Sequence, residues 1–228
     1  MMFADRRDAG RRLASELQRF RGENPVVLGL ARGGVPVGCE IGLALHAPLD
    51  VLLVRKIGVP WQPELAAGAI VDGAKIDRVI DGNLVAMLSI PQDYLEKDAD
   101  RQAREIERRR KVYFGDRAPI DIAGRSVIVT DDGIATGSTM RAVLLAMRRR
   151  SPARIILAIP VAPPDSIAGL AAEADEIVCL ATPAAFGAIS QFYEDFHQVD
   201  DAEVVAGLER AAKVADARGS TSGEQAAS

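Results

Sequence analysis

The sequence predicts an α/β fold, with a mostly parallel, twisted sheet and helices on both faces of that sheet. Two observations lead to this prediction. Short apolar runs rich in Val, Ile and Leu alternate along the chain with longer segments of helical periodicity. Within these runs, apolar residues follow one another without polar residues between them, which is typical of strands buried on both faces of a parallel sheet.

The first half of the chain supplies two strands and an inserted segment. An amphipathic helix is expected over about 4–22, and the strand PVVLGL (25–30) ends in the turn ARGG, before a helix that continues to about His46. The strand LDVLLV (49–54) leads into RKIGVPWQPE, which we expect to be a loop. The segments AAGAIVDG and KIDRVI are expected to pair as short antiparallel strands, because only a brief turn containing glycine separates them.

The second half completes the sheet. A long polar helix is expected over about 92–113, and a further helix begins at TGSTMRAVLLAMRRR. The remaining strands are 126–131, 154–162 and 176–181. The tail, residues 214–228, lacks apolar spacing, so we expect it to be disordered.

Composition narrows the class of protein. The formal net charge of −4 and the isoelectric point near 5.3 argue against a protein built mainly to coat nucleic acid. The apolar runs are too short for a membrane span. No signal sequence is apparent, and the two cysteines, Cys39 and Cys179, lie far apart. We therefore expect a cytoplasmic protein in which both cysteines fill core positions.

The stretch VIVTDDGIATGSTM, residues 127–140, combines an apolar strand, two adjacent aspartates and a turn of small residues at a helix start. The first N–H groups of a helix lack intrahelical partners and the helix dipole favours an anion, so this turn predicts a phosphate site made largely of backbone. It lacks the lysine of a nucleoside-triphosphatase loop. The carboxylates of Asp131 and Asp132 suit a vicinal diol, and a phosphate near a diol describes a ribose 5-phosphate.

The same stretch resembles the ribose-phosphate signature of type I phosphoribosyltransferases, which transfer the ribose phosphate of phosphoribosyl pyrophosphate (PRPP) to a nitrogenous base. LARGGVPVG resembles the pyrophosphate loop of that family, and RKIGVP resembles the basic start of its flexible loop. The resemblance implies a phosphoribosyltransferase domain over residues 1–213, with a flexible-loop insertion at about 55–118 and a small hood at about 182–200.

The resemblance also implies roles for single residues. Asp131 and Asp132 would hold the ribose hydroxyls and support positive charge on the ribose in the transition state. The 5-phosphate loop would consist of Ala135, Thr136, Gly137, Ser138 and Thr139, and the pyrophosphate loop of Arg32, Gly33 and Gly34. A non-proline cis peptide is expected between Ala31 and Gly34.

The chemistry of PRPP requires cations as well as carboxylates, because pyrophosphate departs with growing negative charge. Arg32, Arg55 and Lys56 are the candidates, with Arg32 and Lys56 assigned to catalysis together with the two aspartates. Magnesium would enter with PRPP, bound mainly by phosphate oxygens, and no dedicated protein metal site is apparent. The implied partners are PRPP, a small nitrogenous base and further copies of the chain in a homo-oligomer.

The sequence does not identify the acceptor of the phosphoribosyl group. At residue 135, hypoxanthine- and guanine-type enzymes carry an aspartate that handles the purine, and this chain has Ala135, which makes a 6-oxopurine a poorer candidate. The aromatic residues of the hood could either contact a base or close the core: Phe186, Phe192, Tyr193 and Phe196. A regulator that senses PRPP or a nucleotide without catalysing transfer is the alternative to an enzyme.

Three further features allow two interpretations each. The basic segment 101–111 could fold over pyrophosphate, but its i,i+4 charge pairs favour a solvated helix face. Trp61 could close over the site or serve as a packing anchor. His197 fits a surface or capping position better than that of a catalytic base.

Overall fold

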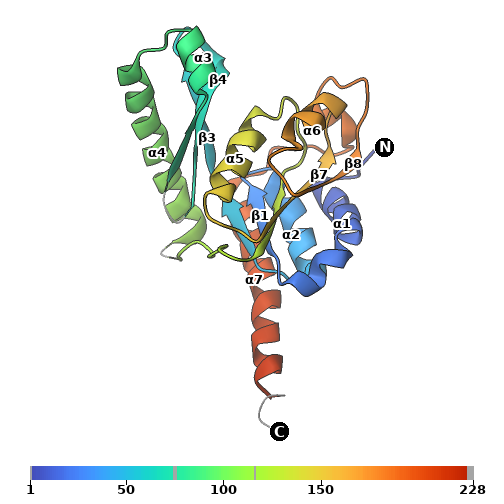
Figure 1. Ribbon diagram of the computed structural model, residues 1–228. Helices are drawn as coiled ribbons and strands as arrows, with labels where there is room; N and C mark the ends of the chain where they lie inside the picture. Colours follow the sequence, from blue (N-terminus) through green and yellow to red (C-terminus); the bar gives the residue numbers. More distant parts are fainter. Residues whose placement is uncertain (1, 74–75, 116, 225–228) are drawn as a thin grey trace.

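The computed structural model describes residues 2–73, 76–115 and 117–224. Its centre is a parallel five-stranded sheet in the order β2-β1-β6-β7-β8 (Figure 1). The strands are β1 (Val26–Leu30), β2 (Leu49–Leu52), β6 (Ser126–Thr130), β7 (Arg154–Val161) and β8 (Glu176–Ala181). The predicted α/β class and the parallel sheet are confirmed.

Helices cover both faces of this sheet. Helices α1 (Arg6–Glu16), α2 (Gly34–Leu45) and α7 (Asp201–Glu224) pack on one face, and α5 (Ser138–Arg148) and α6 (Pro164–Leu170) on the other. The strands feed both cores because successive side chains point to opposite faces of a sheet. Val27 and Ile128 join the first core, whereas Val26 and Val127 join the second. This explains why apolar residues follow one another in the strands without regular alternation.

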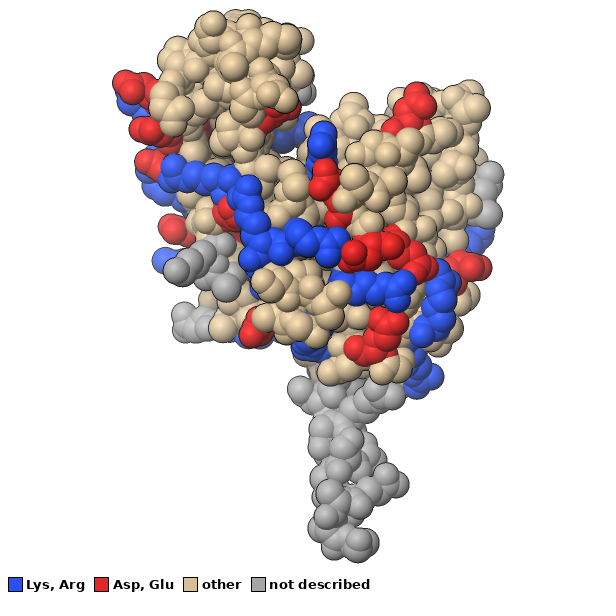
Figure 2. All heavy atoms as spheres, viewed as in Figure 1, with Lys and Arg blue, Asp and Glu red and all other residues tan. Residues whose placement is uncertain are grey.

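An arm departs from the sheet after β2 (Figure 1). It contains a three-stranded antiparallel sheet in the order β3-β4-β5 and two helices. These elements are β3 (Val54–Val59), β4 (Gln62–Val71), β5 (Asp77–Ile80), α3 (Gly82–Met87) and α4 (Gln92–Phe114). The antiparallel pairing of the fourth and fifth strands is confirmed. Figure 2 shows a notch between the arm and the main body.

The prediction of a loop at RKIGVPWQPE is wrong. Residues of this stretch form β3 and the start of β4, joined by a turn at Pro60 and Trp61. Ile57 and Val59 are both fully buried and lie two positions apart, so one face of a strand is apolar. Pairing with β4 and burial of this face outweigh the glycine and the proline that suggested a loop.

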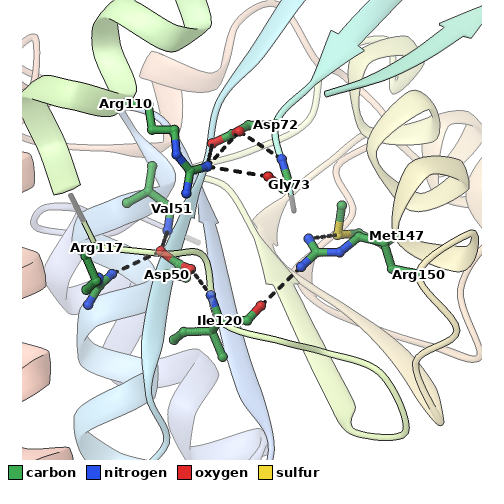
Figure 3. A network of polar contacts seen from close by, with 9 residues as sticks. All are labelled: Asp50, Val51, Asp72, Gly73, Arg110, Arg117, Ile120, Met147 and Arg150. Atoms are coloured by element: carbon green, nitrogen blue, oxygen red, sulfur yellow. Dashed lines mark hydrogen bonds and ion pairs between the residues drawn. The ribbon is translucent and has the colours of Figure 1, made fainter. Parts of the chain in front are cut away.

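The root of the arm is fixed by buried charges (Figure 3). Asp72, directly after β4, accepts two hydrogen bonds from Arg110 of α4, at 2.9 and 3.1 Å. Asp50 of β2 accepts hydrogen bonds from Arg117 at 3.1 Å and from the backbone N–H of Ile120 at 2.8 Å. Both carboxylate side chains are only 5% exposed. The Asp50–Arg117 pair therefore ties the segment that enters the arm to the segment that leaves it, and the Asp72–Arg110 pair ties the end of β4 to α4.

Two further expectations concern the helices. The expected disordered tail is corrected over 214–224, because the backbone of α7 stays helical to Glu224. Alanine is the strongest helix former, and several alanines follow residue 210. Residues 225–228 lie outside the described residues. Within the described ranges, no helix combines the length and the apolar character needed to cross a membrane.

The buried pair at the root of the arm yields a stability prediction. Arg110→Met should lower the free energy of unfolding by about 3–5 kcal/mol, because it leaves the Asp72 carboxylate buried without its partner. Adding Asp72→Asn should recover most of the loss. Urea unfolding measures both changes.

The exposed pair Arg78–Asp100 is the matched control, with side chains 49% and 56% exposed. Arg78→Met should cost no more than about 1 kcal/mol. Equal losses for Arg110→Met and Arg78→Met would show that burial of the Asp72 pair does not anchor the arm.

Candidate functional site

Two turns meet at the carboxyl edge of the sheet. One follows β1 and contains Gly33 and Gly34, and the other follows β6 and contains Asp131 and Asp132. Because β1 and β6 are neighbours, both turns open on the same edge. A Cβ atom on Gly33 would lie 2.1 Å from Oδ2 of Asp132, and one on Gly34 would lie 2.7 Å from the carbonyl oxygen of Thr130. Only glycine allows the turns to approach this closely.

A buried arginine that the sequence analysis did not identify holds this acidic pair. Nε of Arg6 donates to Oδ2 of Asp132 at 2.8 Å, and the two side chains are 9% and 12% exposed. Arg6 also donates to the carbonyl oxygen of His197 at 2.8 Å and lies 3.8 Å from the centre of the Phe196 ring. The hydroxyl of Tyr193 donates to the backbone carbonyl of Asp132 at 2.6 Å.

A signal for Arg6 was present in the sequence. Arg6 lies on the buried face of α1 together with Ala9, Gly10 and Leu13, at helical spacings of three, four and seven. An arginine on the apolar face of a helix needs a buried partner. The identity of the partner could not be predicted, because Asp132 lies 126 positions away in the chain.

Burial raises the pKa of both aspartates. For Asp131 the main cause is loss of solvation, and the neighbouring Asp132 carboxylate raises its pKa further. Burial also raises the pKa of Asp132, although Arg6 opposes the shift. Oδ1 of Asp131 accepts a hydrogen bond from the backbone N–H of Asp132 at 2.8 Å. A positive charge placed beside this pair would favour its ionised form.

The predicted phosphate loop forms the start of α5. Gly137 is the residue before the helix, with a φ of +77° that favours glycine, and no side chain caps the first turn. The hydroxyls of Thr136 and Ser138 lie 3.3 Å apart, and Ser166 of α6 donates to the carbonyl oxygen of Ala135 at 2.7 Å. The first N–H groups of α5 are therefore free of a side-chain cap and available to an anion.

This loop borders a cleft of about 660 Å³, which corresponds to the notch between the arm and the main body (Figure 2). The loop contributes Thr136 through Thr139, and the arm contributes Lys56 and small residues of β4 such as Gly68. Lys56 is the predicted cation that shares a cavity with the phosphate loop.

The other two predicted cations lie elsewhere. Arg32 follows a cis peptide bond at Ala31–Arg32, as expected, and its guanidinium lies 3.8 Å from Oδ1 of Asp201 in α7. Arg55 donates to Oε1 of Gln102 in α4 at 3.0 Å. Successive residues of a strand point to opposite faces, so Arg55 faces α4 while Lys56 faces the phosphate loop. Of the three, only Lys56 lines the cleft beside the phosphate loop.

The hood aromatics form a packed cluster. Phe186 stacks on Phe192 with ring centres 5.4 Å apart, and Tyr193 lies 5.3 Å from Phe3 and 5.0 Å from Phe196. These rings pack with Val161 of β7. The contacts support the core interpretation for these side chains.

The remaining candidates lie at the surface or in the core. His197 is exposed and paired with Asp195 and Glu203, in line with a surface role. Trp61 is 61% exposed, which does not fit a packing anchor. Cys39 is buried and Cys179 is half-buried, and both are free thiols. Among the described residues, no cluster of three or more His, Cys, Asp or Glu could hold a metal ion.

Comparison with known proteins identifies the family. A family model described as "Phosphoribosyl transferase domain" matches residues 4–197. The chain belongs to the phosphoribosyl transferase domain family. A Mycobacterium tuberculosis H37Rv protein with the name "Putative phosphoribosyl transferase Rv0571c" is 46% identical to this phosphoribosyl transferase domain over 210 residues. The match covers 92% of the chain and 47% of that protein, so the chain spans about half the length of the curated relatives it matches.

A solved structure supports the fold of this phosphoribosyl transferase domain. The crystal structure of TT1426 from Thermus thermophilus is 42% identical, with a TM-score of 0.77. The alignment covers 91% of this chain and 98% of TT1426. The overall fold of this chain is therefore similar to one that a crystal structure shows.

The raised pKa of Asp131 yields a prediction about stability. A carboxyl group whose folded-state pKa lies above the unfolded value, near 3.9, stabilises the fold fully below that value, and the contribution is lost as pH rises through the folded pKa. Asparagine has no such proton. Asp131→Asn should therefore raise the melting temperature at neutral pH, by roughly 2–4 °C for each kcal/mol gained, and the gain should shrink toward about pH 4.

Differential scanning calorimetry at several pH values measures this effect. Asp93→Asn removes an exposed carboxylate in the first turn of α4 and should leave the melting temperature unchanged or slightly lower. A lower melting temperature for Asp131→Asn than for the wild type at neutral pH would contradict the account of a strained acidic pair.

Proposed function

We propose that this protein transfers the 5-phosphoribosyl group of PRPP to a nitrogenous base or amine and releases pyrophosphate. The observation that carries the proposal is the turn after β6. It places a half-buried carboxylate, Asp131, and a buried one, Asp132, before a helix start that lacks a side-chain cap. A ligand that places a diol at the two carboxylates and a phosphate at the helix start has the groups of a ribose 5-phosphate. Family membership supports the same class of donor.

Each carboxylate of the pair retains an oxygen for a ligand. Among contacts of the described residues, Oδ1 of Asp132 and Oδ2 of Asp131 accept no hydrogen bond, whereas the other oxygen of each is engaged. The proposed partners of these free oxygens are the ribose hydroxyls. Arg6 would then act as a positioning residue, because it fixes Asp132 from the side opposite the ligand without contacting PRPP.

The reaction breaks the bond between ribose C1 and the pyrophosphate oxygen, and the bonding electrons leave with pyrophosphate. The lone pair of the acceptor nitrogen forms the new bond to C1, and a displaced N–H proton passes to solvent. Positive charge develops on the ribose near Asp131 and Asp132, whose ionised forms stabilise it. Lys56 and Arg32 are the cations proposed to counter the departing pyrophosphate, whereas Arg55 faces α4 and does not line the cleft beside the phosphate loop.

Magnesium is proposed to arrive as part of the substrate. Its charge would be carried mainly by pyrophosphate oxygens, and the two aspartates fit an outer-shell role through water. Mg²⁺ beside the pair would also favour the ionised carboxylates, whose pKa burial raises.

The acceptor of the proposed reaction is not a 6-oxopurine handled by a loop carboxylate. Ala135 stands at the position where the 6-oxopurine enzymes of the family carry an aspartate, and it is exposed in the turn before α5. The backbone carbonyl of Ala135 is taken by Ser166, so it is not offered to a base. The acceptor class is therefore left to a panel of bases and amines.

The experiment combines a binding and a turnover measurement. Mg-PRPP should raise the melting temperature, with a stabilisation that grows as RT ln(1 + [L]/Kd), because it binds the folded state. In the same preparation, pyrophosphate release should occur with at least one member of a panel of purines, pyrimidines and small amines. Asp131→Asn combined with Asp132→Asn should abolish turnover and weaken PRPP binding.

Asp93→Asn combined with Asp100→Asn removes the same charge from the surface of α4 and is the matched control. The absence of any thermal shift at millimolar PRPP would refute the donor assignment. PRPP binding without pyrophosphate release for every acceptor would refute transfer and favour a sensor. Wild-type turnover in the double aspartate variant would refute the role of the pair.

A further inference from the structure

A second cavity lies on the other side of strand β3. It has a volume of about 450 Å³ and is formed between β3 and helix α4. Its lining consists of four arginines, one amide and one carboxylate: Arg55, Arg101, Gln102, Arg104, Glu105 and Arg108. It shares no lining residue with the cleft beside the phosphate loop. The two cavities are therefore separate, and β3 contributes Arg55 to one and Lys56 to the other.

Part of the positive charge in this cavity has no acidic partner. Arg101 pairs with Asp98, and Arg108 and Arg109 share Glu105, each at 2.9 Å. Within the described part of the chain, neither Arg55 nor Arg104 forms an ion pair. Guanidinium groups that converge without a counter-charge repel each other, so an anion in the cavity would relieve the repulsion.

The ion pairs on this helix differ from the i,i+4 pattern that its sequence predicts. The sequence offers Arg101–Glu105, Glu105–Arg109 and Glu107–Lys111, and of these three pairs the described residues form only Glu105–Arg109. Glu105 instead pairs with Arg108 and Arg109, and Arg101 pairs with Asp98. Arg104 therefore has no acidic partner among the described residues, and it lines the cavity together with Arg55 of β3.

Hydrogen bonds to α4 hold Arg55 in place. Its Nε donates to Oε1 of Gln102 at 3.0 Å, and Gln102 is only 8% exposed. The amide nitrogen of Gln102 in turn donates to Oδ1 of Asp98 at 3.4 Å. This chain of hydrogen bonds fixes the guanidinium of Arg55 through Nε, and the Nη atoms remain for an acceptor. The planar fork of guanidinium matches phosphate oxygens in pairs.

We propose that the cavity lined by Arg55, Arg101, Arg104 and Arg108 binds an oligophosphate anion, either a free polyphosphate or the triphosphate of a nucleotide. Its volume suits a chain of two or three phosphate groups, and its four guanidinium groups supply charge for more than one of them. No aromatic side chain lines it, so the phosphates and not a base are the recognised part. This proposal is independent of the proposed transfer reaction.

Isothermal titration calorimetry with inorganic tripolyphosphate tests the site. Arg104→Ala combined with Arg108→Ala removes two charges from the cavity; both side chains are exposed and Glu105 keeps Arg109 as its partner, so the fold should be kept. Lys97→Ala combined with Lys111→Ala removes the same charge from exposed positions of α4 outside the cavity. The cavity variant should bind at least about tenfold more weakly than the wild type, and the lysine variant should match the wild type.

Ser138→Asp separates this site from the phosphate loop, because a carboxylate at the start of α5 repels an anion there. Tripolyphosphate binding should survive this change, and ATP should bind the wild type with similar affinity. The proposal is overturned by wild-type affinity in the cavity variant, by loss of binding in Ser138→Asp, by ATP binding without tripolyphosphate binding, or by no binding at millimolar tripolyphosphate.

Discussion

The close approach of two turns is the constraint on which the site depends. The turn after β1 and the turn after β6 meet because their strands are neighbours in the sheet, and Gly33 gives the Asp132 carboxylate room to lie against the backbone. A side chain on Gly33 would occupy the position of that carboxylate. The order of strands therefore sets which loops meet, and one missing side chain sets how closely they meet.

The same approach creates an electrostatic cost. Two adjacent carboxylates lie where neither is fully solvated, Asp132 buried and Asp131 half-buried, and the loss of solvation raises the pKa of both. Arg6 offsets part of this cost for Asp132, and the backbone N–H of Asp132 does so for Asp131. Active sites commonly retain such unfavourable groups, because their charge becomes favourable only when a ligand or a transition state supplies the opposite charge. The strain of the pair is thus part of its proposed role.

The position of the arm depends on a second set of buried charges. Asp50 pairs with Arg117 across the two segments that join the arm to the sheet, and Asp72 pairs with Arg110 between β4 and α4 (Figure 3). Strand β3 extends from this root into the arm. It carries Lys56 on the side of the phosphate loop and Arg55 on the side of α4. One strand therefore contributes cations to two cavities.

Much of the fold could be predicted because apolar runs of Val, Ile and Leu mark buried parallel strands without reference to distant residues. The motif around Asp131 was equally local, since strand, acids and helix start follow one another within one stretch. Arg6 was missed because its partner is remote in the chain, and β3 was missed because pairing with β4 decides its conformation. The separation of Arg55 from Lys56 required knowing which face of β3 meets which element.

Substitution of Gly33 tests the central claim most directly. Gly33 has φ −61° and ψ −33°, which alanine adopts readily, so Gly33→Ala acts through its contact with Asp132 and not through backbone strain. Gly22→Ala is the control, because a Cβ atom there meets no other atom within 4 Å. The measurement is the Kd of Mg-PRPP by titration calorimetry. The account predicts that Gly33→Ala weakens binding at least about tenfold, or abolishes it, while Gly22→Ala matches the wild type. Wild-type affinity in Gly33→Ala would contradict a site built on the meeting of these two turns.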